Sequence, residues 1–235
     1  MRRDTWPKIG RIAVTCALPV VLVVVSVWIV TGAWFVRWEY NRPGFPSDPG
    51  GFSQSERLEL AEACVEYLVE PRDLSFLAAL RLPNGEPAFD QRELEHMADV
   101  QAVYRGMDGV GWVSIGVVTV GLAGLAWRRS TRQEAFRALY QGALLTLALL
   151  VALGTFMLID WWQFFSAFHA LFFEGDTWLF AASDTLIRLF PTQFWIDAAV
   201  LIVVVTVGEM LLAGVLGLVG RRAYRSCGGA GGHGE

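Results

Sequence analysis

The chain has 235 residues, of which 54% are hydrophobic, and its formal net charge at pH 7 is −4. This composition is too apolar for an ordinary soluble domain and indicates a small polytopic membrane protein. The negative charge argues against a nucleic-acid partner, and the single lysine, Lys8, leaves little for Schiff-base or Walker-type chemistry. Three scattered cysteines form no CxxC pair and no metal-ligand spacing, so neither a disulfide framework nor a metal site is predicted.

Four apolar segments are long enough to cross a membrane, because a helix needs about 20 such residues to span the hydrocarbon core. Three of them carry no charge, namely Ile12–Val36, Gly109–Trp127 and Ala138–Ile159, and the fourth is interrupted within its apolar run only by Glu209. We therefore predict an all-α membrane protein with four transmembrane helices, at about 12–36, 109–127, 138–159 and 196–220. The whole chain, 1–235, is treated as one membrane domain.

The distribution of charge predicts the topology. The N-terminus, the loop 128–137 and the C-terminal tail hold eleven basic residues and three acids, whereas the other two connections hold eight basic residues and eighteen acids. The positive-inside rule then places both termini in the cytoplasm and the two larger connections outside. The Gly-rich tail, 226–235, is predicted to be disordered.

The first outer segment, 37–108, reads as a small helical cap. Ser53 followed by Glu56 is the pattern of a capping box at a helix N-terminus, and the same spacing recurs at Asp90 and Glu93. The helix that begins near Asp90 leads into the second span. Two or three amphipathic helices are expected here, with no strand-like alternation.

The second outer segment, 160–195, holds 12 of the 30 aromatic residues of the chain. Such a segment is too apolar to extend freely into water, so we expect an interfacial or re-entrant loop at the outer leaflet. Gly175 is expected to end its first helical piece, and Pro191 is expected to precede the fourth span.

Only three histidines are present, and His233 in the tail is set aside. His96 has Asp99 one helical turn away, where a carboxylate can fix the imidazole tautomer and raise its basicity. His169 lies among aromatic residues of the second outer segment. Two histidines on the same side of the membrane form a minimal acid–base pair. The alternatives are that His96 is an ordinary solvated residue and His169 a stacked interfacial one.

Other polar residues have two interpretations each. Asp176 and Asp184 are expected as helix caps or as parts of the site. Arg188 can bind a lipid phosphate, stabilise an oxyanion or extend to the interface. Trp178 offers an indole N–H. Glu209, inside a span, is either functional or protonated and hydrogen-bonded to a neighbouring helix.

Three blocks resemble the bacterial lipoprotein intramolecular transacylase family: Glu95–Val100, the pattern His-x-x-Phe-Phe-x-Gly-Asp-x-Trp at His169–Trp178, and Asp184–Pro191. The resemblance runs from about Ser53 to Trp195. It implies a four-span enzyme of the cell membrane that moves the sn-2 acyl chain of a diacylglyceryl lipoprotein to the α-amine of its N-terminal cysteine. The expected partners are this lipoprotein and membrane lipid, and no cofactor is expected.

The resemblance makes His96 and His169 the essential pair, and the predicted topology places the active site at the outer leaflet. Around them we expect a set of supporting or substrate-binding residues: Asp99, Tyr104, Phe165, Phe172, Phe173, Asp176, Trp178, Asp184 and Arg188. Our first assignment makes His96, with Asp99 behind it, the base and puts His169 at the ester, although the roles can be reversed. Two rival hypotheses stay open, a non-enzymatic membrane or transporter accessory protein and an outer-leaflet phospholipase or two-substrate acyltransferase.

Overall fold

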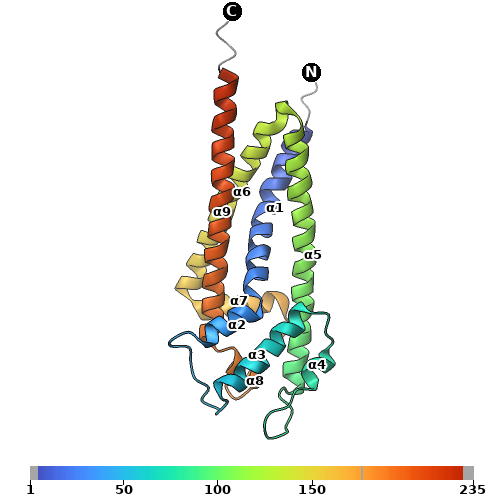
Figure 1. Cartoon of the computed structure of the whole chain (residues 1–235), viewed down its shortest axis with the longest axis vertical. Helices are drawn as coiled ribbons and strands as arrows, with labels where there is room; N and C mark the ends of the chain where they lie inside the picture. The colour runs from blue at the N-terminus through green and yellow to red at the C-terminus, as the bar shows by residue number, and fades with distance from the viewer. Residues whose placement is uncertain (1–4, 176, 230–235) are drawn as a thin grey trace, which may run out of the picture. The chain divides into compact units, whose positions relative to one another are not determined.

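The computed structural model describes residues 5–175 and 177–229, with side chains described as far as Tyr224. Within these ranges the regular elements are all helices, joined by loops (Figure 1). The only strand-like feature among the described residues is an isolated bridge between Arg81 and Pro87. The elements in chain order are α1 (Trp6–Val30), α2 (Ala33–Tyr40), α3 (Gln54–Val69), α4 (Leu74–Ala78), α5 (Gln91–Trp127), the 3₁₀ turn η1 (Arg129–Thr131), α6 (Arg132–Ile159), α7 (Trp161–Phe172), α8 (Thr185–Leu189) and α9 (Thr192–Gly229).

Four of these helices are long and apolar enough to cross a membrane: α1, α5, α6 and α9. The predicted all-α membrane fold with four spanning helices is therefore confirmed. The helix α5 has 37 residues and is about 55 Å long at 1.5 Å per residue, well beyond the ~30 Å of a hydrocarbon core. Its charged N-terminal part, which precedes the uncharged run that begins at Gly109, therefore extends beyond the hydrocarbon core.

The chain divides into two compact units, which are described separately below. The bundle unit comprises Met1–Ser26, Asp108–Ile159 and Val203–Glu235, and the cap unit comprises Val27–Met107 and Asp160–Ile202. Three helices, α1, α5 and α9, contribute residues to both units.

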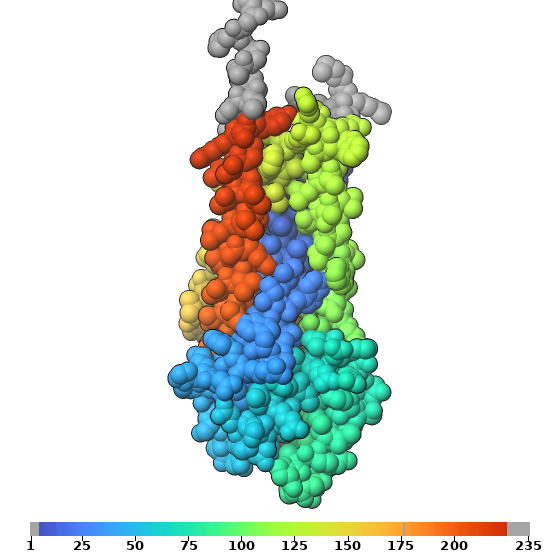
Figure 2. All heavy atoms as spheres, in the orientation of Figure 1, coloured from blue at the N-terminus to red at the C-terminus, as the bar shows by residue number. Residues whose placement is uncertain are grey.

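Small residues allow the helices of the bundle unit to approach closely. A Cβ atom added at Gly217 on α9 would lie 2.7 Å from the backbone nitrogen of Tyr140 and 2.8 Å from the carbonyl oxygen of Phe136, both on α6. A Cβ atom at Gly121 on α5 would lie 2.5 Å from a methyl group of Val14 on α1. In the space-filling view, α1 lies between α5 and α9 (Figure 2). Close helix contact through small residues is typical of membrane bundles.

Glu209 in the bundle unit has a hydrogen-bonding environment. Ser26 is completely buried, and its hydroxyl oxygen lies 2.8 Å from the carbonyl oxygen of Leu22 and 3.4 Å from Oε2 of Glu209. Thr206 donates a 2.8 Å hydrogen bond to the Ser26 hydroxyl oxygen. This geometry favours the predicted alternative in which Glu209 is hydrogen-bonded to a neighbouring helix.

The first uncharged run, 12–36, is divided between two helices. The helix α1 ends at Val30, Gly32 is extended with φ −159° and ψ 154°, and α2 begins at Ala33. The indole of Trp34 donates a 2.6 Å hydrogen bond to the carbonyl oxygen of Ile29, one of the carbonyls at the end of α1. The absence of charge does not reveal this break, because Gly32 is uncharged like the residues on either side of it.

Both predicted capping boxes form. The Ser53 hydroxyl accepts from the backbone N–H of Glu56, whose carboxylate accepts from the Ser53 N–H. Before α5, Asp90 and Glu93 make the same reciprocal pair, with N···O distances of 2.8 and 2.9 Å. These contacts satisfy backbone donors that a helix N-terminus leaves unpaired.

The helix α7 contains no buried residue, and several of its apolar side chains are exposed: Trp162, Phe168, Leu171 and Phe172. An exposed face of this kind suits a membrane interface better than water. Gly175 follows α7 with φ +60°, a left-handed conformation that favours glycine. The helix α9 begins at Thr192 and continues to Gly229. It therefore includes the first residues of the segment 226–235, which was predicted to be disordered, and residues 230–235 lie outside the described ranges.

Candidate active site

His96 and His169 both lie in the cap unit, on different helices. His96 is in the charged N-terminal part of α5, one turn after Glu93, and His169 is in the last turn of α7. Both imidazoles contact the ring of Phe173, with centroid separations of 5.0 Å for His96 and 5.6 Å for His169. Phe173 itself is buried. The fold thus brings together two histidines that are 73 positions apart in the sequence.

The ring of His169 is surrounded by aromatic side chains. Its centroid lies 4.0 Å from that of Phe165 and 4.7 Å from that of Trp178, and Phe168 is an edge-on neighbour at 5.7 Å. Its Nδ1 lies 2.8 Å from the carbonyl oxygen of Phe165. A carbonyl oxygen only accepts, so Nδ1 carries a proton and the neutral ring keeps its lone pair on Nε2.

His96 has a different hydrogen-bonding state. It contacts Phe180 edge-on at 5.2 Å in addition to Phe173. Its Nδ1 is buried and has no hydrogen-bond partner among the described residues. A buried N–H without an acceptor is unfavourable, so we place the proton of the neutral ring on Nε2.

Burial keeps both imidazoles neutral. Burial, as the larger cause, and the neighbouring His169 together lower the pKa of His96 from its ordinary value of 6.5 to about 4. Burial also lowers the pKa of His169, against a smaller opposing effect of the Phe165 carbonyl. At neutral pH the site therefore holds two uncharged rings, one with a free lone pair and one with a free N–H.

Asp99 does not support His96 in the way the sequence indicated. Its side chain is exposed, and the imidazole Nδ1 that it was expected to orient has no partner among the described residues. Spacing of i and i+3 places two residues on one helix surface, but the rotamer of His96 turns its ring toward Phe173 and Phe180 instead. The predicted base-orienting contact is therefore absent from this structure.

Arg188 is engaged in an internal ion pair. Its guanidinium donates to both carboxylate oxygens of Asp48, at 3.1 and 2.7 Å, and lies 3.5 Å from the ring centroid of Phe52. The Asp48 side chain is fully buried, and the hydrogen bond from Arg188 is the main cause that lowers its pKa to about 2. This pairing fixes the proline-rich loop to α8, which gives Arg188 a structural function in this geometry.

A second buried carboxylate, Glu93, connects α5 to α8 and was predicted only as a helix cap. It is 3% exposed and accepts a 2.7 Å hydrogen bond from the backbone N–H of Leu186. Asp184, the N-cap residue of α8, pairs with Arg92 at 3.0 Å and accepts from the N–H of Ala181. Since α5 also carries His96, these contacts hold its first turns in place.

The remaining predicted residues have varied positions. Phe165, Phe173 and Trp178 surround His169, whereas Phe172 is 45% exposed and contacts only Phe168 among the ring contacts described for it. Tyr104 is half-buried on α5. Asp176 lies outside the described residues, so its predicted contribution stays a prediction.

Sequence reasoning missed a buried charge cluster in the cap unit. Arg42 bridges Glu39 at 2.8 Å and also pairs with Asp197, and the Glu39 side chain is completely buried. Oε2 of Glu39 and Nε of Arg42 are buried without hydrogen-bond partners among the described residues. Burial raises the pKa of Glu39. Nothing in local sequence spacing predicts that α2 and the start of α9 share this cluster.

The described residues contain no group of three His, Cys, Asp or Glu side chains placed to hold a metal ion. The fold and the site together define an all-α integral membrane protein with a two-histidine aromatic site. The model of the lipoprotein intramolecular transacylase family, Lit, matches residues 12–195, and the chain belongs to this family. The expectation drawn from the three sequence blocks is confirmed.

Two kinds of relative extend this result. An uncharacterised protein of Aquifex aeolicus is 28% identical over 222 residues, which cover 94% of this chain and 99% of that protein. The membrane-integral lipoprotein intramolecular transacylase Lit from Bacillus cereus has a similar structure, with a TM-score of 0.79 and 22% identity over 94% of this chain and 98% of the other. Two variants of that protein, in which a histidine is replaced by arginine or alanine, align with a TM-score of 0.69. At this identity the structural likeness establishes the fold.

Proposed function

We propose that this protein moves the sn-2 acyl chain of a diacylglyceryl-modified lipoprotein to the α-amine of the lipid-bearing cysteine. The product is the N-acyl, S-monoacylglyceryl lyso-form. Membership of a transacylase family supports acyl transfer. The observation that carries the proposal at atomic level is the pair of neutral imidazoles of His96 and His169, which both contact the ring of Phe173.

The reaction is an isomerisation of the substrate. The amine nitrogen attacks the ester carbonyl carbon, a C–N bond forms, the C–O bond to glycerol breaks, and one proton moves from nitrogen to oxygen. An α-amine with a pKa near 8 needs only a mild base to lose its proton. Because amine and ester belong to one molecule, proximity supplies much of the rate, and neither water nor a soluble co-reactant enters the balance.

In this proposal His169 carries the proton. Its Nδ1–H is held by the Phe165 carbonyl, which directs the Nε2 lone pair toward an incoming proton. The imidazole accepts the amine proton as the tetrahedral intermediate forms and returns it to the departing glycerol oxygen. Burial lowers the pKa of His169, which keeps the base unprotonated at neutral pH.

His96 has the complementary role. With its proton on Nε2, the neutral ring donates a hydrogen bond to the oxyanion that develops on the ester carbonyl oxygen. The depressed pKa of His96 favours this neutral donor over an imidazolium. This assignment reverses the one made from the sequence, in which Asp99 was expected to make His96 the base.

The exposed aromatic face of α7 supports binding of the acyl chains. Three apolar side chains close to His169 in the sequence are exposed: Phe168 by 47%, Leu171 by 75% and Phe172 by 45%. Apolar side chains at an interface suit lipid tails, and a reacting ester lies at the same depth as the boundary. We place this face at the outer leaflet of the cell membrane, with both chain termini in the cytoplasm, on the distribution of charges.

Mass spectrometry of a synthetic diacylglyceryl lipopeptide incubated with the purified protein tests the proposal. Substrate and product have the same mass, so each sample is split and half is treated with mild alkali, which cleaves esters and leaves amides. The lyso-form keeps one acyl chain after this treatment, whereas the substrate loses both. A loss of fatty acid without alkali would instead show a phospholipase, and a transfer to added lysolipid would show a two-substrate acyltransferase.

Substitutions separate the two histidine roles. His169→Ala and His169→Gln are both expected to reduce lyso-form production by about 100-fold or more, because neither side chain accepts a proton. His96→Gln is expected to retain more activity than His96→Ala, since an amide N–H replaces the hydrogen-bond donor. Glu95→Gln, on an exposed position beside His96, is the control and should leave activity unchanged. Full activity of either alanine variant would refute the two-histidine mechanism.

A further inference from the structure

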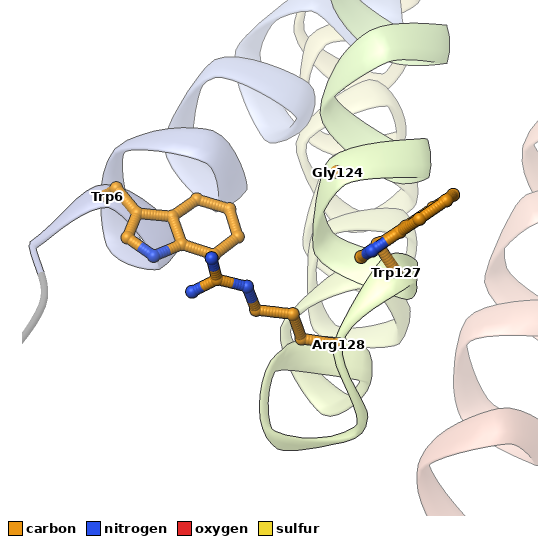
Figure 3. Close-up of a pocket in the computed structure, with 4 residues that line it drawn as sticks. All are labelled: Trp6, Gly124, Trp127 and Arg128. Atoms are coloured by element: carbon orange, nitrogen blue, oxygen red, sulfur yellow. The ribbon is translucent and has the colours of Figure 1, made fainter.

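The end of the bundle unit where α1 begins and α5 ends carries a hollow that the proposed acyl transfer does not use. Its lining residues are Trp6 on α1 and Gly124, Trp127 and Arg128 on or just after α5. Figure 3 shows the guanidinium of Arg128 turned toward the ring of Trp6. The two groups form a cation–π contact, with Cζ of Arg128 5.8 Å from the ring centroid.

The hollow lies beside the contact between α1 and α5, which continues to this end, since Leu125 is fully buried and lies 3.6 Å from a Cβ atom added at Gly10. At Gly121 an added Cβ atom would lie 2.5 Å from Val14, so the helices are in close contact there. One turn later, at Gly124, an added Cβ atom would meet no other atom within 4 Å. Trp6 and Trp127 border this open space, and they are 37% and 85% exposed.

Among the described residues, no ion pair balances the positive charge of Arg128 in the hollow. Across residues 5–26 and 128–159 the only acidic side chain is Glu134, which pairs with Arg11 at 3.0 Å and with Arg137 at 2.5 Å. Within the described residues Arg128 has no ion pair. Arg129 and Arg132, its exposed neighbours, add to the positive potential of the same loop.

We propose that this hollow binds the headgroup of an anionic phospholipid. Indole rings are stable at the boundary between hydrocarbon and water, and an arginine fork binds phosphate oxygens through two parallel N–H donors. The local excess of basic over acidic residues favours a lipid with a net negative charge, because no free carboxylate is described here to bind the ammonium group of a zwitterionic headgroup. Trp6 and Trp127 flank the glycerol region, and Arg128 contacts the phosphate.

Native mass spectrometry of the detergent-solubilised full chain, titrated with phosphatidylglycerol or phosphatidylcholine, tests this site. Arg128→Gln is expected to weaken phosphatidylglycerol binding by about fivefold, the effect of one basic residue near a headgroup, with a smaller change for phosphatidylcholine. Arg129→Gln is the matched control. It removes the same charge from the same loop. The hydrogen bond described for Arg129 is accepted by its backbone oxygen from the Tyr224 hydroxyl, so the substitution leaves that bond in place. Binding in this control should fall by less than about twofold if the hollow is a specific site.

A second variant fills the hollow without changing its charge. Gly124→Leu has room for its side chain and is expected to weaken phosphatidylglycerol binding about as much as Arg128→Gln. Thermal unfolding of each variant in detergent verifies that the bundle is intact. Equal losses in Arg128→Gln and Arg129→Gln would show diffuse attraction and overturn the proposal, as would equal affinity for the two lipids or unchanged binding in Gly124→Leu.

Discussion

The bundle unit and the cap unit are held together by different interactions. In the bundle unit, glycines such as Gly217 bring helix backbones into contact, and the described ion pair of Arg11 with Glu134 is partly exposed. In the cap unit, the carboxylates of Asp48 and Glu93 are buried and each is bound by specific donors. A membrane bundle relies on close packing because lipid tails give no hydrophobic driving force between helices, whereas a cap with irregular loops needs directional bonds.

This difference also bears on the proposed acyl transfer. Catalysis by proton transfer needs titratable side chains in fixed positions, and the cap unit supplies both the imidazoles and the buried hydrogen bonds that hold α5 and α8. The bundle unit contributes Glu209 with Ser26 and Thr206, a polar group that its neighbours already satisfy in part. Three predictions test whether the two units depend on different interactions, in decreasing order of expected effect.

Arg188→Ala should cause the largest loss of stability. It leaves the fully buried carboxylate of Asp48 without its cation, which lowers the free energy of unfolding by about 3–5 kcal/mol. Unfolding of the detergent-solubilised protein, followed by tryptophan fluorescence, measures the change. Arg11→Ala in the bundle unit breaks a partly exposed pair and should cost about 1 kcal/mol or less. Similar losses in the two variants would contradict the contrast between the units.

Acid should destabilise the cap unit through His96 before it affects Asp48. The folded-state pKa of His96 is about 4, below the unfolded value of about 6.5, so the unfolded chain binds more protons between these limits. Stability is therefore fully present at pH 7 and falls as the pH drops from 6.5 to 4, by about 2–3 kcal/mol from this residue. The pKa of Asp48 is about 2, so its contribution is lost only below pH 4.

Unfolding curves of the unsubstituted protein and of His96→Phe at pH 7 and pH 4.5 measure this effect. Phenylalanine fills a similar volume and does not titrate, so the variant should lose less stability on acidification. An identical loss in both proteins would show that other groups cause the acid sensitivity.

Gly217→Ala should have the smallest of the three effects and act on the bundle unit alone. The added methyl group meets backbone atoms of Tyr140 and Phe136, which cannot move without shifting α6. Overpacking of this kind costs about 1–2 kcal/mol. Gly124→Ala is the control, because its methyl group meets no atom within 4 Å and alanine is the better helix former. Thermal unfolding that ranks Gly217→Ala above Gly124→Ala in stability would contradict the described helix contact.

Much of the fold was predictable because it depends on local properties of the sequence. Uncharged length indicates a spanning helix wherever it occurs, and a Ser–Glu or Asp–Glu spacing of three forms a capping box within a single turn. Both boxes, at Ser53 and Asp90, formed as predicted. The break at Gly32 escaped prediction because it depends on how the end of α1 meets α2, which hydrophobicity does not record.

Sequence and tertiary structure contribute different parts of the candidate site. The sequence by itself determined the membrane class, the four spans and the family, since these follow from composition, spacing and local motifs. It also selected His96 and His169 as candidates, and their catalytic function stays a prediction. Only the tertiary structure decided that both rings contact Phe173, that Arg188 is bound by Asp48, and that Nδ1 of His96 has no hydrogen-bond partner among the described residues. The physical reason is that rotamers and pairings between distant segments are selected by packing and burial, which act only after the chain has folded.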